Sequence, residues 1–540
     1  MTGAIFTFTI NLQSAKIIVS QKSALRAALL VLFDKAKTKK ERGFYMKNYM
    51  KKTIPLLLVL LLLLPMAAAC KNTNPTDPGT KESDTLAEEI DLGLPARDLG
   101  GVDYKILDAN DKPELHVNYS ESNSGSAVEQ VLFERDAYVE KAFNVILRYE
   151  QINNVDNKAI STFTNSHDAG DRLCDMIVST LSGGRLTTLA CNGYLADLAS
   201  LPNMMLDENW WSSQMYEQMS LGGKMYFSTG DIMASVYDAP MVMYANKTLL
   251  AQYNITDNLY DKVNDGTWTI EYLTTLVKDT DRDLNSDNQM SVNDDFYGFA
   301  TQPLRLTVQG MLVGMGYTLS NVVDETILID LDTDITSYLD LIKGAVSPIT
   351  INWGAGQSTD DVINKVFKND RAIFLCHLIE AATHNLKDMA SDYTILPMPK
   401  GNVEQTSYHS LINGWVNCFV GVPYFADNGE YAELAGFVPE VLARTSYYIV
   451  RPVAFDKIVM YQSIREPESM KMLDIIYNTL YLDFHAVYDF GGWGTEVANY
   501  VYKNKAISST LTGLRDTILA DAQDIADQWL NPRGGKESKE

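Results

Sequence analysis

Three short stretches decide the fold: Val102-Asp-Tyr-Lys-Ile-Leu107, Ser126-Ala-Val-Glu129 and Val145-Ile-Leu-Arg-Tyr149. The first and the third are apolar runs that are typical of β-strands. The second is a capping box, in which a serine and a glutamate satisfy free N–H groups at the start of a helix. Apolar side chains then follow at helical spacing, at Val128, Val131, Leu132, Val139, Ala142 and Phe143. Strand, helix and strand in this order predict a βαβ unit.

Alternation of strands and helices continues from this unit to about Lys400, and no internal repeat is present. The pattern predicts a strand at Asp175 to Ser179, a hairpin on a two-glycine turn at Leu221 to Ser228, a strand near Met241 to Tyr244, a helix from about Lys247 and a helix over Thr510 to Trp529. About 440 residues follow residue 100, which is more than one typical core holds. We therefore expect an α/β protein with two lobes.

Cys70 ends an apolar segment and opens a polar one. Basic residues and then apolar residues precede it: Lys47, Lys51 and Lys52, followed by Ile54 to Ala69. This order is that of a bacterial lipoprotein signal, and the apolar run is shorter than the ~20 residues that a spanning helix needs. We expect residues 46–69 to be cleaved and Cys70 to carry a lipid. Ala67 stands where such signals usually have leucine, and an uncleaved membrane anchor is the alternative.

A signal peptide belongs at the start of a chain, yet this one begins near Met46. The tract Lys39-Lys-Glu-Arg-Gly43 can be encoded by an unbroken purine run of the ribosome-binding type. We therefore expect translation to start at Met46 and residues 1–45 to be upstream sequence; a genuine extension, with an amphipathic helix over Ser23 to Phe33, is the alternative. Residues 70–100 are rich in Thr, Asp, Pro, Gly, Ser and Glu, so we expect a flexible tether.

The charge balance excludes one class of partner. Residues 1–69 hold 11 Lys+Arg and 2 Asp+Glu, so the rest of the chain holds 34 basic and 67 acidic residues, a net charge of −33. Such an acidic surface repels phosphate backbones, which argues against binding of nucleic acid. It also means that the lipid, and not basic side chains, would hold the protein at the membrane.

The remaining cysteines give no sign of a metal site. Cys174, Cys191, Cys376 and Cys418 form no C-x-x-C pair and have no zinc spacing with histidines. We expect small buried apolar side chains at these positions. A disulfide remains open, because the spacing does not indicate one.

Six segments coincide, in order, with one protein family: Gly222-Gly-Lys-Met-Tyr-Phe-Ser-Thr-Gly-Asp231, Tyr244-Ala-Asn-Lys-Thr-Leu-Leu250, Gly266-Thr-Trp-Thr-Ile-Glu-Tyr-Leu273, Asp295-Phe-Tyr-Gly-Phe299, Lys368-Asn-Asp-Arg-Ala-Ile-Phe374 and Tyr393-Thr-Ile-Leu-Pro-Met-Pro-Lys400. Over residues 101–530 the chain resembles the extracellular solute-binding proteins of sugar ABC importers, of the maltodextrin-binding type. It looks closest to the large lipoprotein forms of clostridia-like bacteria.

The resemblance implies a two-lobed periplasmic-binding-protein-like fold whose chain crosses the hinge several times. It implies a first lobe of residues 101–237 and 371–424, and a second lobe of residues 238–370 and 425–540. It further implies a monomer on the extracellular face of the cell membrane that holds a carbohydrate between its lobes, works with an ABC permease and catalyses no reaction. A cleft between hinged lobes buries a small ligand, and closure reports occupancy.

Sugars have flat apolar faces and many hydroxyls, which suit aromatic platforms and polar side chains. Trp415, in Asn413-Gly-Trp-Val-Asn417, lies in a segment that lines the cleft in the family. Trp493, in Phe490-Gly-Gly-Trp-Gly494, is flanked by glycines, so we expect it to be exposed on a loop. Further candidate contacts are Asp231 after the hairpin, Ser179 and Thr180 at a strand's carboxyl end, Glu121 in the loop after the first strand, and Arg305.

Each candidate has a structural alternative. A tryptophan is more often part of a core than a platform, and Asp231 could cap its own turn. Glu121, Ser179 and Thr180 could be ordinary loop residues. We expect Trp210, Trp211 and Trp268 to be structural.

Residues 283–294 match a calcium loop of twelve residues. The ligand positions are Asp283, Asn285, Asp287, Gln289 through its carbonyl, Ser291 and Asp294. Asn288 stands where glycine is usual, and asparagine tolerates a left-handed turn better than most residues. Asp294 stands where glutamate is usual, as in dockerin-type loops. We expect a structural calcium ion, with a merely acidic, solvated loop as the alternative.

Two other functions stay open. A surface glycoside hydrolase needs two opposed carboxylates, and the many acidic residues supply candidates. No G-x-S-x-G, H-E-x-x-H or P-loop motif is present in the sequence. A binder of a non-sugar solute, such as a peptide, polyamine or metal chelate, is the third possibility, since an acidic cleft favours cations.

Overall fold

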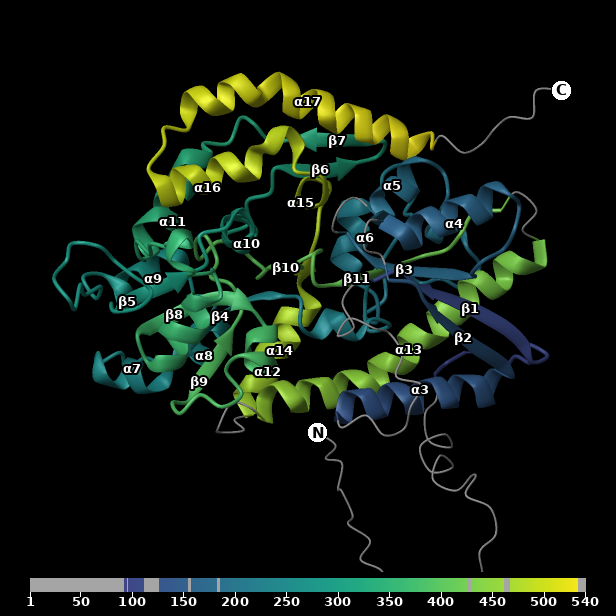
Figure 1. Cartoon of the computed structure of the whole chain (residues 1–540), viewed down its shortest axis with the longest axis horizontal. Coiled ribbons are helices and arrows are strands. Elements are labelled where there is room, and N and C mark those ends of the chain that lie inside the picture. Colours follow the sequence, from purple (N-terminus) through teal and green to yellow (C-terminus); the bar gives the residue numbers. More distant parts are fainter. Residues whose placement is uncertain are drawn as a thin grey trace, which may run out of the picture. The chain divides into compact units, whose positions relative to one another are not determined.

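A computed structural model of the chain describes residues 92–94, 96–110, 126–153, 157–181, 185–425, 429–460 and 467–532 (Figure 1). The chain divides into two compact units, Met1–Thr80 and Lys81–Glu540, and every described residue belongs to the second. The signal segment, Cys70 and Glu121 lie outside the described residues. None of the helices in the described ranges combines the length and the apolar character that crossing a membrane requires.

The predicted βαβ unit is present and belongs to a first sheet, with strand order β11-β3-β1-β2. Strand β1 (Val102–Asp108) pairs in parallel with β2 (Val145–Gln151) and with β3 (Met176–Thr180), whereas β11 (Cys418–Gly421) is antiparallel to β3. Helix α3 (Ala127–Phe143) connects β1 with β2, and Ser126 is its N-cap, although the serine side chain makes no capping hydrogen bond. We call this sheet and the helices packed on it the first lobe.

A second sheet has the order β5-β8-β4-β9 and forms the second lobe. Its strands are β4 (Met241–Asn246), β5 (Tyr297–Thr301), β8 (Ala372–Leu378) and β9 (Tyr393–Leu396). Strand β8 is parallel to β5 and antiparallel to β4. The expected assignment of residues 371–424 to the first lobe is therefore wrong for β8 and β9. Only the later part of that range, which contains β11, joins the first sheet.

The helices cover both sheets. In the first lobe and its connections they are α4 (Lys158–Asp168), α5 (Arg185–Cys191), α6 (Ser213–Met219) and the short η4 (Leu198–Ser200) and η5 (Ala234–Tyr237). In the second lobe they are α7 (Lys247–Gln252), α8 (Leu259–Asn264), α9 (Ile270–Val277), α10 (Arg305–Gly314), α11 (Ile335–Ala345), α12 (Glu380–His384) and the short η6 (Trp353–Ala355), η7 (Val362–Val366) and η8 (Phe367–Asn369).

The last third of the chain contacts both lobes. The long helix α13 (Gly429–Met460) packs mainly against α3 of the first lobe and also contacts α12 and α14 on the side of the second. The expected assignment of this range to the second lobe alone is therefore wrong. The remaining elements are α14 (Pro467–Asn478), which packs against β9, then α15 (Phe484–Tyr488), η9 (Phe490–Gly492), α16 (Trp493–Lys503) and α17 (Ser508–Leu530), the helix predicted near the end of the sequence. Two small sheets complete the fold: β6 (Ser320–Val323) with β7 (Thr326–Ile329), and β10 (Ser410–Leu411) with β12 (Leu480–Tyr481).

The expected hairpin at residues 221–228 is reduced to a tight turn. Leu221 and Lys224 form a single antiparallel bridge, and no strand follows on either side. Gly222 and Gly223 have φ angles of +60° and +75°, which explains the two glycines, since side chains with a Cβ rarely adopt such angles.

Two of the passages between the lobes, residues 235–241 and 411–418, run side by side, and we call them the crossing segments. A third passage leads from α13 to α14. The N–H of Asn413 donates to the carbonyl of Ala239 (3.1 Å), and Pro240 bridges to Ile412. The N–H of Cys418 donates to Oγ of Ser235 (2.8 Å). These bonds hold the two crossings together as one narrow junction.

The crossing segments fix which ends of the sheets face each other. Met241 starts β4 and lies opposite Leu378, the end of β8, while Cys418 starts β11 and lies opposite Thr180, the end of β3. Because β1 is parallel to β3 and β5 is parallel to β8, the carboxyl ends of all four strands lie at the junction. Parallel strands bind ligands at their carboxyl ends, so both sheets direct their binding edges toward the same region.

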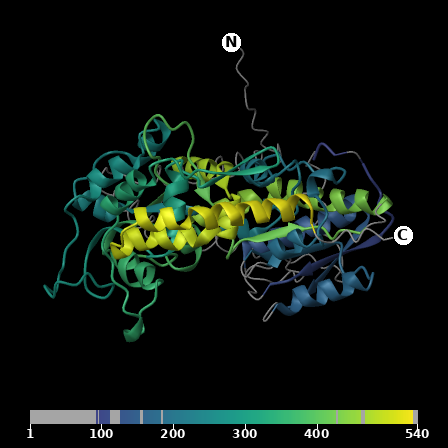
Figure 2. The same ribbon diagram turned by 90° about the horizontal axis from the view of Figure 1, so that it is seen from above.

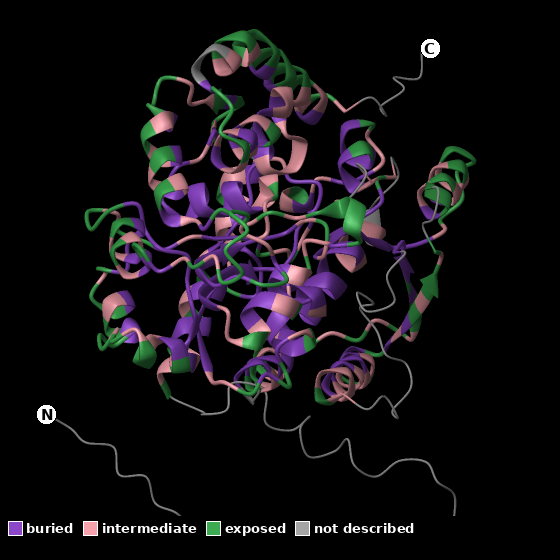
Figure 3. Cartoon of the chain, turned by 60° about the vertical axis from the view of Figure 1, so that its left-hand side comes forward, coloured by how far each residue is buried: buried purple, intermediate pink, exposed green. Residues whose placement is uncertain are grey.

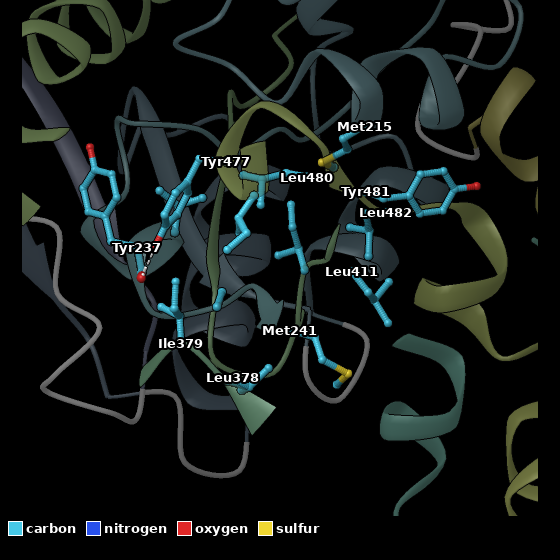
Figure 4. Packing of buried hydrophobic residues seen from close by; sticks show 14 of the residues in the cluster. Met215, Tyr237, Met241, Leu378, Ile379, Leu411, Tyr477, Leu480, Tyr481 and Leu482 are labelled. Atoms are coloured by element: carbon cyan, nitrogen blue, oxygen red, sulfur yellow. Dashed lines mark hydrogen bonds between the residues drawn. The ribbon is translucent and has the colours of Figure 1, made fainter. Parts of the chain in front are cut away.

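One apolar cluster fills the junction and both lobes (Figure 3). Figure 4 shows its central part, where Met241, Leu378 and Ile379 of the second lobe lie near Tyr237, Leu411 and Tyr477. The hydroxyl of Tyr477 donates to the carbonyl of Tyr237 there. The two lobes therefore share a core at the crossing segments.

The start of the described chain is fastened to α13. Arg444 donates from a guanidinium nitrogen to the carbonyl of Leu92 (2.7 Å), and Leu92 is buried. Arg97 forms an ion pair with Glu433 (3.2 Å), and its guanidinium lies 4.9 Å from the ring centre of Phe437. Residues 92–97 thus contact the first lobe.

Candidate ligand-binding site

A cavity of about 150 Å³ lies where the two lobes meet. The first lobe contributes the start of α3 and the end of α13, the second lobe contributes α12, and η5 with the first crossing segment forms the floor. The polar side chains that line it include those of Glu129, Ser235, Tyr237, Asp238, His384 and Lys457. The cavity therefore has walls from both lobes and a lining rich in charge.

Asp238 is the acidic residue on the floor of this cavity. Its carboxylate accepts a hydrogen bond from the hydroxyl of Thr383 (3.3 Å), and its carbonyl accepts the N–H of Glu380 (3.1 Å). Burial raises the pKa of Asp238, while the nearby His384 and Lys457 act in the opposite direction. Asp238 thus links the crossing segment to α12 and lies near His384 and Lys457.

The other charged groups of the lining have no ionic partner within the described part of the chain. Glu129, His384 and Lys457 each line the cavity, and none of them forms a salt bridge with a described residue. Charged side chains that point into a cavity without a partner can bind hydroxyl or charged groups of a ligand.

The sequence analysis missed this set of residues. Asp238 carries no local signal of function, because only the pairing of the crossing segments brings it opposite α12. One signal could have pointed to Asp238. It lies just before the apolar strand that begins at Met241, and a polar residue in front of a strand at a lobe junction is a candidate ligand contact.

Asp231, the predicted acidic contact, is enclosed in the protein. It is fully buried, and its carboxylate pairs with Arg451 (2.8 Å) and accepts the hydroxyl hydrogen of Tyr237 (2.7 Å). Burial raises the pKa of Asp231, and the charge of Arg451 opposes this rise. In this structure its role is an internal ion pair, and Asp238 is the acid that reaches the cavity.

Trp415 is exposed at the edge of the first sheet, as a platform requires. The side chain is 55% exposed, and the backbone N–H of Trp415 donates to Oδ1 of Asn413 (2.9 Å). The preceding residue, Gly414, accepts the N–H of Leu181 just after β3 (2.9 Å). The structure therefore brings Trp415 next to the carboxyl end of β3, where Ser179 and Thr180 were predicted to act.

Ser179 and Thr180 themselves are buried. The hydroxyl of Ser179 donates to the carbonyl of Ala109 (2.8 Å), and Oγ1 of Thr180 accepts a hydrogen bond from Arg185 (3.2 Å). The hydroxyl of Ser179 thus binds the backbone at Ala109, and the hydroxyl of Thr180 binds the side chain of Arg185. Their neighbours at this edge, Trp415 and Arg185, are the more accessible groups.

Trp493 is buried, and the expectation of an exposed loop residue is wrong. It is 2% exposed, it is the first residue of α16, and its ring stacks on Tyr317 (centroids 6.2 Å apart) and meets His485 edge-on (4.9 Å). Gly491 and Gly492 have φ angles of +62° and +69°, so the glycines turn the chain into the helix and allow the indole to pack inward.

Arg305 lies near Trp493 in the second lobe. It begins α10, four residues after the end of β5, and pairs with Asp489 (2.5 Å). Asp489 in turn accepts the N–H of Gly494 (2.9 Å), next to Trp493. The predicted contacts thus fall into two groups, Trp415 with Thr180 in the first lobe and Arg305 with Trp493 in the second.

A small cavity of about 20 Å³ borders Trp493, large enough for one water molecule. Asp483 and His485 line it. Burial raises the pKa of Asp483 to about 6 and lowers the pKa of His485 to about 3. Most of the other lining residues are apolar, among them Leu312, Val313 and Leu411.

Trp210, Trp211 and Trp268, which we expected to be structural, are buried. Trp268 is fully buried, and its indole N–H donates to the carbonyl of Pro397 (2.9 Å). Trp210 and Trp211 are buried and donate to the two carboxylate oxygens of Glu440 (2.7 and 2.8 Å). The four cysteines that are described are buried and form no disulfide with one another.

The predicted calcium loop is a series of side-chain-capped turns. Asp283 accepts the N–H groups of Ser286 (2.7 Å) and Asn288 (2.8 Å), and Asn288 has the expected positive φ of +62°. Asp295, which is buried, closes the loop by accepting the N–H groups of Leu284 (2.9 Å) and Ser291 (2.6 Å), whereas Asp294 is exposed. Among the described residues no three His, Cys, Asp or Glu side chains are grouped around a common point for a metal.

Comparisons with known proteins give structural neighbours only. A scan against protein-family models gave no match, and a search of curated proteins gave none either. An ABC substrate-binding protein of Listeria monocytogenes in complex with cycloalternan aligns with a TM-score of 0.44 and 14% identity, over 77% of this chain and 98% of its own. The maltose/maltodextrin-binding domain of Bdellovibrio bacteriovorus, bound to maltotriose, aligns with a TM-score of 0.41 and 14% identity, over 79% and 99%. The cyclic alpha-maltosyl-1,6-maltose binding protein of Arthrobacter globiformis aligns with a TM-score of 0.49 and 12% identity, over 79% and 100%.

Proposed function

We propose that the protein is the solute-binding component of an ABC importer and captures a sugar or oligosaccharide between its two lobes without breaking a bond. The observation that carries this proposal is the two-lobed junction, where the carboxyl ends of β1, β3, β5 and β8 lie at the crossing segments. A separate set of residues from both lobes lines a cavity beside the first crossing segment. The ordered segments that resemble sugar-binding proteins support the proposal, and so does the exposed Trp415 at the edge of the first sheet.

The cavity also supports a hinged mechanism. Its volume of about 150 Å³ is below the ~300–1,000 Å³ of usual ligand sites, so an oligosaccharide requires the lobes to part. The crossing segments and the passage from α13 to α14 would act as the hinge of such a motion. A lipid on Cys70, an extracellular location and a permease partner complete the proposal, and they rest on the sequence alone.

Isothermal titration calorimetry should detect saturable binding of at least one member of a panel of maltotriose, cycloalternan and cyclic alpha-maltosyl-1,6-maltose. In Asp238→Asn the affinity is expected to fall about tenfold or more, because a charged acceptor for hydroxyls is lost. In Trp415→Ala a similar loss is expected from the missing stacking surface. The matched controls are Asp257→Asn, an exposed acid in an ion pair with Lys262, and Trp353→Ala, a 64% exposed tryptophan in η6.

Three outcomes would count against the proposal. Release of shorter products from a bound glycan would identify a glycoside hydrolase. Binding of spermidine but of no sugar would identify a binder of cationic solutes. Glu129 and Asp238 are the acids in the cavity that could bind such a ligand. Equal losses in the control variants would show that Asp238 and Trp415 have no special part in binding.

We also propose that residues 283–294 bind calcium in a structural role, supported by the ligand spacing and by the left-handed Asn288. Adding a chelator to the calcium-loaded protein is expected to lower the melting temperature by about 3 °C or more, since a bound ion at 100 times its Kd contributes about 2.7 kcal/mol. Asp283→Ala should abolish this shift, while Asp332→Ala, a 94% exposed acid elsewhere in the same lobe, should keep it. If the chelator does not change the melting temperature of the original protein, residues 283–294 bind no structural calcium and are only solvated turns.

A further inference from the structure

The two side chains of the predicted capping box do not cap α3. Ser126 is the N-cap of this helix, but its side chain makes no capping hydrogen bond. The carboxylate of Glu129 forms no hydrogen bond or ion pair within the described part of the chain. Both residues instead line the cavity of about 150 Å³ beside the first crossing segment. Their usual local role is unfilled, so both side chains are available to a ligand.

Charged groups of both signs line this cavity. The acids are Glu129 in the first turn of α3 and Asp238 in the first crossing segment. The basic groups are Lys457 in the last turn of α13 and His384 in the last turn of α12. None of the four forms an ion pair with another described residue. The walls of the cavity therefore hold opposite charges apart.

The basic groups are nevertheless close to Asp238. Burial raises the pKa of Asp238, and His384 and Lys457 both oppose this rise, which requires them to be near the carboxylate. The hydroxyl of Thr383 donates to the same carboxylate (3.3 Å) and fixes its direction. The gap thus has a negative side and a positive side, which suits a ligand that carries both charges.

The size and position of the cavity also limit the ligand. A volume of about 150 Å³ is below the ~300–1,000 Å³ of usual ligand sites, so the cavity fits one end of an oligosaccharide and not the whole. Helices α3, α12 and α13 lie along the bottom of Figure 1, whereas α17 lies at the top. Figure 2 views the molecule from the side of α17, so the three helices that line the cavity lie on the far side there.

We propose that this cavity binds the terminal unit of a sugar that carries both an ammonium and a carboxylate group. The ammonium binds between Glu129 and Asp238, and the carboxylate binds between Lys457 and His384. Hydrogen bonds between charged groups are about twice as strong as those between neutral groups, so a neutral sugar uses these four side chains less well. The inference rests on the proposed function for the sugar ring, whereas the arrangement of charges does not depend on it.

The test compares four monosaccharides by isothermal titration calorimetry at about pH 6.5, where amines are protonated and carboxylates are ionised. Muramic acid carries both charges, glucosamine only the ammonium, glucuronic acid only the carboxylate, and glucose neither. We expect muramic acid to bind at least about tenfold more tightly than glucose, with the two singly charged sugars between them. Added salt should reduce this preference, because the cavity is open to solvent ions.

Two variants of the full chain identify the two sides of the cavity. Lys457→Met should lower the affinity for muramic acid and glucuronic acid about tenfold without lowering that for glucosamine. Glu129→Gln should lower the affinity for muramic acid and glucosamine without lowering that for glucuronic acid. The matched controls are Lys141→Met and Glu134→Gln, both on α3 and outside the lining of the cavity, and they should change none of the affinities.

The outcomes separate this inference from the proposed function. Equal affinities for the four monosaccharides, or equal losses in the control variants, would overturn the charged site, while binding of maltotriose in the same experiments would keep the proposed function. Alanine carries both charges without a sugar ring. Binding of alanine but of no sugar, with the expected losses in Lys457→Met and Glu129→Gln, would keep the arrangement of charges and refute the sugar.

Discussion

Replacement of Glu440 by alanine is expected to lower the free energy of unfolding by about 3–5 kcal/mol. The carboxylate is fully buried in α13 and accepts hydrogen bonds from both indole N–H groups of Trp210 and Trp211. It also accepts the N–H of Met205 (3.1 Å) and pairs with Arg444 (3.3 Å). Alanine would leave these buried donors without an acceptor and the guanidinium without its counter-charge. Denaturant unfolding at pH 7 measures the loss.

Two further variants separate this cause from a general disturbance of α13. Glu440→Gln keeps a side-chain acceptor and should cost clearly less than alanine. Glu433→Ala, on the same helix, removes an acid that is 47% exposed and paired with Arg97, and should change stability by no more than about 1 kcal/mol. Equal losses for Glu433→Ala and Glu440→Ala would refute the hydrogen-bonding role of Glu440.

Lowering the pH from 6.5 to 4 is expected to cost about 3 kcal/mol of stability through His377 alone. Burial in β8 lowers the pKa of this histidine from 6.5 to about 4, against opposing effects of the hydrogen bond to the Leu378 carbonyl and of Asp360. Below pH 6.5 the unfolded chain takes up a proton on His377, whereas the folded chain does so only near pH 4. The unfolded state therefore binds more protons in this window, and stability falls as the pH falls.

The variant His377→Leu isolates this contribution. Asp483 acts in the opposite direction, because its pKa is raised to about 6 and its buried charge disappears as the pH falls. That effect is common to both proteins and cancels when their unfolding free energies are compared at pH 6.5, 5 and 4. The difference between them should change by about 3 kcal/mol across the range. If the unfolding free energies of the two proteins change in parallel with pH, His377 takes up its proton in the folded state as readily as in the unfolded state.

The elements that the sequence predicted well are those with a local signal. The strands β1, β2, β3 and β4 and the helices α3 and α17 all follow from apolar periodicity, which reports the face that each element buries. The pairing of β8 with β4 could not be predicted in this way, because nearly 130 residues separate the two strands and no local pattern records a partner. The lobe boundaries failed for the same reason.

The candidate site shows the same limit at the level of single residues. Trp415 was expected at the cleft because of the resemblance; the structure shows it exposed just before β11, and its contact with a ligand stays a prediction. Trp493 was misplaced because flanking glycines are equally compatible with a loop and with the entry to a helix, and only the positive φ angles distinguish them. Asp231 and Asp238 are both acids near the first crossing, and burial alone decides which of them reaches the cavity.

The fastening of residues 92–97 to α13 has a mechanical consequence. Arg444 and Glu433 transmit any tension on the preceding chain to α13, and through the packing of α13 on α3 to the sheet that contains β1. Because α13 also contacts α12 and α14, part of the same load reaches the second lobe. A pull on that end of the chain would therefore act first on the first lobe and reach the second through α13.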